Sequence, residues 1–546
     1  MTMVSSSVSV KSTGSPGSSL HWNALTMVAT RSMEDWLYYS LSITFCLALS
    51  YLVSNFRRRP ATGKPSLPPG PKGLSVIGPL LFIGWTSYGI ELIVRAARSW
   101  YGPVFTLNLL PNPVVFIADR GVARRVLVQG GAAFADRPPA NLATRIFSSD
   151  QHNITSAAYG PVWRVLRRNL TGKVLHPSYL IRRYAVARRE AVSGLVAGVA
   201  RQMRDEGDGV VVVEGLLHHA IFHVFVRMCF GEGLGDGVVA SVTALQREFL
   251  TSVVGFQVFS VVPAVTKLVY RRRWEKMLSI RRRQEELFLP LIRTRMKVGM
   301  QDAGGGTVDC YADSLLGLRI PEDGGRSLTE REMVSLCSEF LAGGTDSTVA
   351  VMQWTMANLV ARPEIQAALR AEIRDVVGDG DLQDEQLHRM PYLRAVVLEG
   401  LRRHPPGRFM LPHAATEDGG AAFDGFHVPR HALVNFALGG MAMDGEVWAA
   451  PMEFRPERFL PGGEGADVDL TGSKEIMMMP FGAGRRICPG IEAALLHLEF
   501  FLANLVREFE WTEVPGDPVD FAERQEMSVV MRRPLRAKVV PSCIHN

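Results

Sequence analysis

The sequence predicts a mainly α-helical fold with small β-sheets, preceded by a single N-terminal transmembrane helix. Residues 36–56 contain no charged side chain, and a run of this length is about what a helix needs to cross the hydrocarbon core of a membrane. From about residue 84 to Pro363, the apolar residues recur mostly with helical spacing. Strand-like runs are short, and VFTLNLLPNPVVFIA at residues 104–118 predicts a β-hairpin because Pro-Asn-Pro interrupts two apolar runs.

The composition restricts the class of protein. The chain has 546 residues, 47% of them hydrophobic, which indicates a globular protein with one large core or two. The net charge of +6 suits an anionic membrane surface or an acidic partner, but it is too small and dispersed to indicate nucleic-acid binding. The six cysteines show no paired or CxxC spacing, so we expect a reducing compartment and no disulfide framework.

The N-terminal region is expected to be a membrane anchor. Aromatic residues at 36–39 would lie at one interface and Arg57–Arg59 at the other, so the positive-inside rule places the bulk of the chain in the cytosol. A cleaved signal peptide is the alternative, but its apolar core would be shorter and would end in small residues. Four units are expected: a disordered Ser-rich tail (1–32), a transmembrane anchor (33–56), a basic stop and Pro-rich hinge (57–83), and a catalytic domain (84–546). The tail is either a targeting segment or a stretch that precedes the true start of the protein.

One loop, PFGAGRRICPG from Pro480 to Gly490, holds a single cysteine at the start of a predicted helix. Pro489 suits the first turn of that helix, and the following IEAALLHLEFFLANLV has helical periodicity. The helix dipole and the neighbouring amides are expected to favour the thiolate form of Cys488.

The remaining residues of this loop indicate a flat anionic ligand. Gly482, Gly484 and Gly490 permit a positive φ or the close approach of a large planar group, and Arg486 suits an anion at the edge of that group. Haem meets these requirements, with iron for the thiolate and propionates for the arginine. A hydrolase would need a histidine base, and zinc would need further Cys or His ligands nearby.

A long helix is predicted from Thr329 to Arg362, beginning with a Thr329–Glu332 capping box. Its middle, LAGGTDSTVA, places two glycines and four polar residues where a buried helix is normally apolar. Glycines cost about 1 kcal/mol each in a helix, and a buried Asp346 costs more unless it is satisfied. Such a concentration of broken local rules is typical of a functional site; a kinked structural helix is the alternative.

The cysteine loop resembles the haem-binding signature of the cytochrome P450 family, F-x-x-G-x-R-x-C-x-G, at Phe481, Gly484, Arg486, Cys488 and Gly490. Four further motifs of this family occur in the expected order: WxxxR (Trp163 to Arg167), the oxygen-binding helix (Gly343 to Thr348), ExxR (Glu399 to Arg402) and PERF (Pro456 to Phe459). The resemblance covers roughly residues 67 to 540. MPFGAGRRICPG together with ALLHLEFFLANLV is similar to plant microsomal A-type members of family eighty-nine.

The resemblance implies a cytochrome P450 fold that binds haem b (iron protoporphyrin IX), with Cys488 as the axial ligand of the iron. It also implies that four residues hold the propionates: Trp163, Arg167, His413 and Arg486. Since His413 follows a predicted turn, a core histidine is the alternative for it. Phe481, Gly484 and Gly490 belong to the same cofactor-binding loop.

The resemblance gives two further groups of residues a role. Glu399, Arg402 and Arg458 would form a buried charge network that braces the cysteine side of the haem. Asp346 and Ser347 would relay protons to dioxygen, and Thr348 could substitute. Serine at 347 stands where the family more often has threonine, which leaves the hydroxyl less restricted.

The activity implied is that of a haem-thiolate monooxygenase. Electrons from NADPH would arrive through a separate NADPH–cytochrome P450 reductase, one oxygen atom would enter a small lipophilic substrate, and the other would leave as water. The segments expected to line the pocket are 136–160, 256–262, 409–411 and 527–530. The alternatives are a reductase-independent isomerase or dehydratase and a non-catalytic haem-binding redox protein; the polar cluster on the predicted helix argues against both. The anchor implies a single-pass protein of the endoplasmic reticulum membrane with a cytosolic haem-thiolate domain (84–546).

Overall fold

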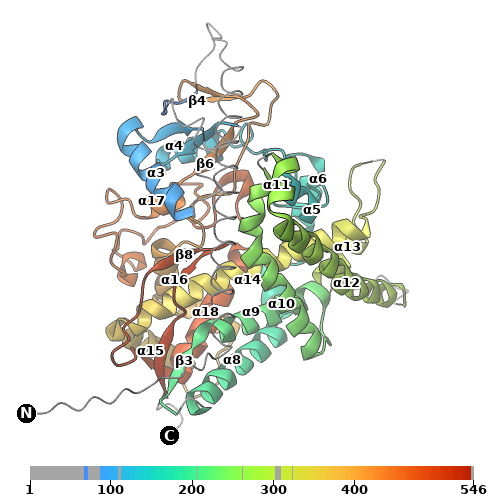
Figure 1. Ribbon diagram of the computed structural model, residues 1–546. Helices are drawn as coiled ribbons and strands as arrows, with labels where there is room; N and C mark the ends of the chain where they lie inside the picture. Colours follow the sequence, from blue (N-terminus) through green and yellow to red (C-terminus); the bar gives the residue numbers. More distant parts are fainter. Residues whose placement is uncertain are drawn as a thin grey trace, which may run out of the picture.

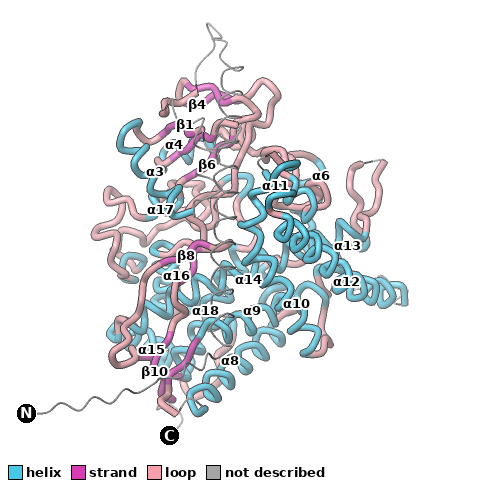
Figure 2. The backbone as a smooth tube through the Cα atoms, in the orientation of Figure 1, coloured by secondary structure: helices cyan, strands magenta, loops and turns pink. Residues whose placement is uncertain are grey.

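The computed structural model describes residues 67–71, 87–108, 112–205, 207–260, 262–301, 309–322 and 324–542. These residues form a helical body with small sheets near its edges (Figures 1 and 2). This arrangement confirms the predicted mainly helical class. The predicted anchor (33–56) and most of the predicted hinge (57–83) lie outside the described residues. Within the described part of the chain, no helix is both long enough and apolar enough to span a membrane.

The helices alternate in chain order with a few short strands. The α-helices are α3 (Ser87–Tyr101), α4 (Arg120–Arg124), α5 (Leu142–Phe147), α6 (Pro161–Lys173), α7 (Pro177–Arg182), α8 (Ala185–Asp205), α9 (Val213–Phe230), α10 (Asp236–Val253), α11 (Pro263–Val269), α12 (Arg271–Gln301), α13 (Tyr311–Leu316), α14 (Glu330–Val360), α15 (Pro363–Val377), α16 (Pro391–Arg403), α17 (Leu438–Ala442) and α18 (Ile491–Glu508). The tighter or wider helical turns are η1 (Arg125–Gln129), η2 (Val254–Ser260), η3 (Asp384–Arg389), η4 (Pro456–Phe459) and η5 (Gly484–Arg486).

The strands form two three-stranded sheets and two hairpins. They are β1 (Val104–Leu107), β2 (Val114–Ile117), β3 (Val210–Val212), β4 (Ala421–Phe423), β5 (Phe426–Val428), β6 (Leu433–Phe436), β7 (Phe509–Thr512), β8 (Glu523–Gln525), β9 (Val529–Met531) and β10 (Arg536–Pro541). The sheet orders are β1-β2-β6 and β3-β10-β7, and the hairpins are β4-β5 and β8-β9. The antiparallel pairing of β1 with β2 confirms the hairpin predicted for residues 104–118.

Helix α14 lies in the middle of the helical body (Figure 1), and most of its residues are buried. It begins as predicted: Thr329 Oγ1 accepts from the Glu332 N–H, and the Glu332 carboxylate accepts from the Thr329 N–H. The helix runs without a break through Gly343 and Gly344. A Cβ at Gly344 would lie 2.0 Å from a ring carbon of Phe225, which shows that this glycine lets α9 pack closely against α14.

Candidate functional site

The cysteine loop is a series of tight turns that end at α18. The Cys488 N–H donates to the Phe481 carbonyl at 2.9 Å, and the Ile487 N–H donates to the Gly484 carbonyl at 3.1 Å. Gly482 and Gly484 have φ values of 71° and 73°, which are left-handed conformations that glycine adopts without strain. The loop therefore fixes the Cys488 side chain just before the first turn of α18.

The three loop glycines differ from one another in what they contact. Gly484 has the positive φ that was expected as one of its two uses, and a Cβ there would lie 1.9 Å from the Leu127 carbonyl oxygen in η1, so the close approach that it permits is that of protein backbone. Gly490 has a φ of −102°, so it does not use a left-handed conformation. Gly482 combines a positive φ with a position in the cavity wall.

Burial raises the pKa of the Cys488 thiol, while the Gly490 N–H, 3.4 Å from Sγ, and the charge of Arg167 act in the opposite direction. The Gly490 N–H thus lowers the pKa of the thiol in the expected direction, but burial outweighs it. A coordinated metal ion deprotonates a thiol outright, so iron would set the charge state of Cys488.

A cavity of about 400 Å³ lies next to this thiol. Most of its wall is apolar, and it takes residues from the cysteine loop, α6, α14 and several other segments, among them 406–411 and 527–528. The predicted site residues that line it are Trp163, Arg167, Ser347, Thr348, Phe481, Arg486, Cys488 and Gly490. Those that do not line it are Asp346, His413, Gly484, Glu399, Arg402 and Arg458.

Trp163 and Arg167 bring polar groups of α6 into the cavity wall. The Trp163 Nε1–H is buried and has no hydrogen-bond partner among the described residues. The Arg167 guanidinium lies 6.0 Å from the Trp163 ring, and burial lowers its pKa. A buried donor without a partner is costly, so these two side chains suit an anionic ligand.

Arg486 also lines the cavity, but most of its guanidinium N–H groups already donate to backbone carbonyls. Its guanidinium donates to the carbonyls of Ala135 at 2.7 Å, Ile154 at 3.3 Å and Ala157 at 2.7 Å, and it lies 4.5 Å from the Trp163 ring. Burial lowers its pKa to about 10. Arg486 thus ties two distant segments to the cysteine loop and adds positive charge beside the Trp163 indole.

His413 lies behind the cavity wall. Its Nδ1 is 2.7 Å from the Phe134 carbonyl, and its Nε2 is buried without a partner among the described residues. Burial lowers the pKa of His413 to about 3, helped by the nearby charges of Arg137 and Arg486. This geometry favours the core-histidine alternative over a direct contact with a propionate.

Arg137 lines the cavity and was missed in the sequence. Its Nη1 donates to the carbonyls of Leu411 and Pro412, both at 2.9 Å, and its Nε donates to the Thr155 carbonyl at 2.9 Å. Burial lowers its pKa to about 9. The sequence held one signal for this role: Arg137 lies inside the segment 136–160, which was expected to line the pocket.

These residues fit haem. One cavity is lined by a partly buried thiol, an indole N–H without a partner among the described residues, three arginines and a largely apolar remainder, as a flat apolar group with two carboxylates requires.

In the polar turn of α14, Gly343 to Thr348, the side-chain hydroxyls bond to backbone carbonyls of the same helix. The Ser347 hydroxyl donates to the Gly343 carbonyl at 3.0 Å, and the Thr348 hydroxyl donates to the Gly344 carbonyl at 2.7 Å. Asp346 is buried, and burial raises the pKa of its carboxyl. One of its oxygens, Oδ2, has no hydrogen-bond partner in the described part of the chain.

The predicted charge network is present away from the cavity. Arg402 donates to both oxygens of Glu399 at 2.7 and 2.8 Å, and Arg458 donates to the same carboxylate at 3.3 Å. The N–H of Arg455 adds a further bond to it at 2.8 Å. All three charged side chains of the network are fully buried.

Residues 148–157, called here the wall segment, separate the cavity from a groove near the start of α14. Ile154 and Thr155 line the cavity, and their N–H groups donate to Glu339 of α14 at 2.8 and 2.5 Å. Ser149, Asp150 and Gln151 have φ values of 49°, 57° and 68°.

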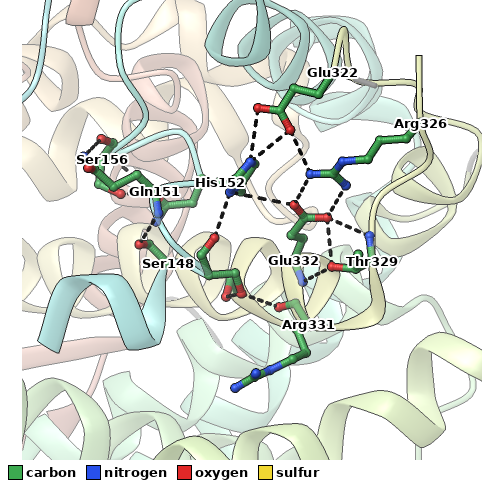
Figure 3. A network of polar contacts seen from close by, with 12 residues as sticks. Ser148, Gln151, His152, Ser156, Glu322, Arg326, Thr329, Arg331 and Glu332 are labelled. Atoms are coloured by element: carbon green, nitrogen blue, oxygen red, sulfur yellow. Dashed lines mark hydrogen bonds and ion pairs between the residues drawn. The ribbon is translucent and has the colours of Figure 1, made fainter. Parts of the chain in front are cut away.

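His152 fastens the outer end of the wall segment (Figure 3). Its Nδ1 is 2.8 Å from the Ser149 carbonyl, and its Nε2 is 3.1 Å from Glu322. Glu332 lies 3.8 Å from the Nδ1 and also binds Arg326. The wall segment is thus joined to α14 through His152 with Glu332, through Ser149 with Arg331 and Ser335, and through the N–H groups of Ile154 and Thr155 with Glu339.

The predicted lining segments are confirmed in part. Phe409, Met410 and Leu411 line the cavity, as do Met527 and Ser528. The segment 256–262 does not: residues 256–260 belong to η2 and Val262 is the N-cap of α11, and Phe256, Val258 and Phe259 are buried in a separate core cluster against α12. Its apolar character reflects packing in that cluster.

Comparisons with known proteins identify the family and the fold of the chain. The family model described as cytochrome P450 matches residues 68–540. Cytochrome P450 89A9 of Arabidopsis thaliana is 40% identical over 489 residues, covering 87% of this chain and 94% of its own length. A flavonoid 3'-monooxygenase of the same plant is 30% identical, with 87% of this chain and 91% of its own length covered. A zebrafish cytochrome P450 structure with progesterone superimposes with a TM-score of 0.65 at 22% identity, covering 85% of this chain and 99% of that one.

Proposed function

The chain belongs to the cytochrome P450 family, within it to plant family 89, and we propose that it inserts one atom of dioxygen into a small lipophilic substrate as a membrane-bound haem-thiolate monooxygenase. The observation that carries this proposal is that one largely apolar cavity is lined both by the Cys488 thiol and by the hydroxyl residues of α14. The relatives named as flavonoid 3'-monooxygenases support oxygen insertion as the reaction class.

Haem would be held by Cys488 as the thiolate ligand, with Trp163, Arg137, Arg167 and Arg486 beside its propionates. When bound, it supplies the activation of dioxygen. Each of these side chains lines the cavity. The protein's own contribution is to position the thiol, exclude water with the apolar wall and place positive charge beside the carboxylates.

The polar turn of α14 supplies the proton-transfer groups in this proposal. Ser347 and Thr348 line the cavity and anchor their hydroxyls on carbonyls one turn earlier. Asp346 is buried beside them, with a raised pKa caused first by burial. A carboxyl whose pKa is raised toward neutrality is suited to donate protons.

The electron source and the location complete the proposal. NADPH electrons would arrive through a separate flavin reductase, and residues 33–56 would anchor the catalytic domain (84–546) to the cytosolic face of the endoplasmic reticulum. The charge-free apolar run and the arginines after it support the anchor. Deleting residues 1–56 should release part of the protein from the membrane fraction, and complete retention would contradict a dominant anchor.

The test is turnover of a panel of lipophilic substrates by the full-length protein with a plant reductase. We expect product to require both NADPH with reductase and dioxygen. Product formation without either would favour an isomerase or dehydratase, and haem binding without any turnover would favour a redox protein. Cys488→Ala should abolish the carbon monoxide difference band of thiolate-ligated ferrous haem, and a retained band would remove the ligand assignment.

A further inference from the structure

The wall segment has a groove on its outer side as well as the cavity on its inner side. The groove, of about 590 Å³, lies between α5, the wall segment and the first turn of α14. Ser149, Asp150 and His152 line the groove, whereas Ile154 and Thr155 line the cavity. A movement at His152 is therefore only two residues away from the wall of the cavity.

The inner and outer ends of the wall segment are held in different ways. At the inner end, the N–H groups of Ile154 and Thr155 donate to Glu339, and the Thr155 carbonyl accepts from Arg137 at 2.9 Å. At the outer end, three consecutive non-glycine residues, 149–151, have left-handed conformations, which are unfavourable for them. The outer end therefore depends on the side-chain bonds that hold this turn.

His152 joins this turn to the loop before α14 (Figure 3). Its Nδ1 lies 2.8 Å from the Ser149 carbonyl, and its Nε2 lies 3.1 and 3.3 Å from the two oxygens of Glu322. A carbonyl and an ionised carboxylate can only accept hydrogen bonds, so each ring nitrogen needs its own proton to bond here. A neutral imidazole carries one N–H and makes one of the two bonds, whereas the protonated ring makes both.

The charged groups that face His152 come from each of the neighbouring elements. Arg326 of the same loop pairs with Glu322 at 2.9 Å and with Glu332 of α14 at 2.7 Å, and Glu332 lies 3.8 Å from the His152 Nδ1. With protonated His152, the two carboxylates and two cations of this cluster balance. The other charged side chains on this face, from α5, the wall segment, α12 and α14, are paired: Arg145 with Asp150, and Arg281 and Arg331 with Glu285.

His152 is the member of this cluster that titrates near neutral pH. Burial lowers its pKa, but the Ser149 carbonyl and the carboxylates of Glu322 and Glu332 outweigh burial and raise the pKa above the ordinary histidine value. Its side chain is 25% exposed, so protons reach it from the groove. Both bonds are therefore present below the ordinary pKa, and one is lost as pH rises through the raised value.

We propose that the contacts of His152 with Ser149 and Glu322 form a pH-sensitive latch on the wall of the cavity. The latch is closed when both ring nitrogens carry protons, and it loosens when one proton leaves. The inner bonds to Glu339 then act as the hinge about which the outer end of the wall segment moves. A looser wall admits bulky lipophilic ligands to the cavity faster, whatever reaction takes place there, so this inference goes beyond the proposed function.

The first test measures ligand entry into the full-length, haem-loaded protein in its ferrous state. The probes are cyclohexyl isocyanide, which is bulky, and carbon monoxide, which is small; both bind the iron with a change in absorbance, and neither takes up protons between pH 6 and pH 9. We expect the rate of isocyanide binding to rise about two- to fivefold from pH 6 to pH 9, the factor that one net hydrogen bond is worth. The rate of carbon monoxide binding should stay constant.

Two variants assign this pH dependence to the latch. His152→Gln has no titrating ring and should bind the isocyanide at every pH as fast as the parent does at pH 9. Glu322→Gln keeps an acceptor oxygen but removes the negative charge, so the midpoint of the pH profile should move to lower pH. Glu510→Gln, which changes an exposed glutamate on β7, is the matched control and should leave the midpoint unchanged.

Three results of this test would overturn the proposal. They are a pH-independent rate in the parent, a His152→Gln profile like that of the parent, and an equal pH dependence for carbon monoxide, since pH would then act at the iron.

The second test follows the wall segment itself by hydrogen–deuterium exchange, comparing the parent with His152→Gln at the same pH. At pH 6 the amides of residues 148–157 should exchange about two- to fivefold faster in the variant, because one net hydrogen bond is missing. At pH 8 the difference should be smaller, and peptides from α18 should exchange equally in both proteins. Equal exchange of the wall segment at pH 6 would show that His152 does not hold it and would overturn the proposal. A parent protein that makes no NADPH-dependent product contradicts the proposed function and leaves both tests of the latch decisive.

Discussion

Glu399 on α16 and Asp346 on α14 are both buried carboxylates, and the number of partners available to each differs. Glu399 accepts hydrogen bonds from two arginine side chains and from a backbone N–H. Asp346 keeps one oxygen without a partner among the described residues. An unpaired buried polar atom costs about 1–3 kcal/mol, so this cost is avoided at Glu399 and retained at Asp346.

The difference indicates two kinds of buried charge in one molecule. Around Glu399 the opposite charges compensate one another, and together they hold α16 against the PERF turn (η4). Around Asp346 the carboxylate has a raised pKa and a cavity-lining hydroxyl beside it. Each of the following substitutions tests this difference or a neighbouring contact.

The largest effect is expected for Glu399→Gln. The substitution leaves the buried guanidinium of Arg402 without a compensating charge and Arg458 with Glu464 alone, and breaking a buried ion pair costs about 3–5 kcal/mol. We expect little soluble protein and little bound haem, measured by haem per polypeptide and by thermal unfolding. A variant that melts like the parent would show that the network is not structural.

A steric comparison on α14 should give the next largest effect. Gly344→Ala places a Cβ 2.0 Å from the Phe225 ring, and overpacking of this kind costs about 1–3 kcal/mol. Gly343→Ala is the matched control: outside its own helix turn, its Cβ meets no described atom within 4 Å. Alanine there should raise the free energy of unfolding by up to about 1 kcal/mol. Equal effects of the two variants in chemical denaturation would contradict the packing assigned to Gly344.

Asp346→Asn should separate chemistry from folding. We expect haem content and unfolding temperature to be at least as high as in the parent, while NADPH-supported product falls by about tenfold or more. The sign for stability follows from the raised pKa: ionised Asp346 destabilises the folded state above that pKa, and the effect disappears as pH falls. The asparagine variant should therefore lose this part of the pH dependence of unfolding. Loss of haem instead would assign Asp346 to a structural role.

The smallest effect is expected for His152→Gln. Burial opposes protonation of His152, but the Ser149 carbonyl and the carboxylates of Glu322 and Glu332 outweigh it and raise its pKa. Its contribution to stability is therefore full below the ordinary histidine pKa and is lost as pH rises through the raised value. We expect the parent to exceed the variant by less than about 1 kcal/mol at pH 6 and by nothing at pH 9, measured by thermal unfolding. A difference that grows with pH would contradict this sign.

Local patterns predicted much of the molecule. The capping box of α14 and the hairpin of β1 and β2 depend on residues close together in the sequence, and both are confirmed. The cysteine loop was identified for the same reason. These features need no knowledge of which distant segments meet.

Features that depend on distant contacts were missed. Gly484 is required by the carbonyl of Leu127, and Arg137 reaches Leu411 and Pro412 across the cavity wall. Neither contact leaves a periodic pattern in the sequence. The apolar segment 256–262 was misassigned because burial in a core cluster and exposure to a lipophilic pocket select the same side chains.

The three left-handed residues of the wall segment affect the order in which the chain can fold during synthesis. Non-glycine residues in this conformation cost about 1 kcal/mol or more each, and Ser149 gains its compensating bonds from Arg331 and Ser335, which lie 182 and 186 positions later. Local bonds, such as Gln151 N–H to Ser148 Oγ and Arg145 to Asp150, can form early, but the bonds of Ser149 to α14 can form only after the ribosome has released that helix. The cavity wall must therefore be completed late, after most of the helices around it have been synthesised.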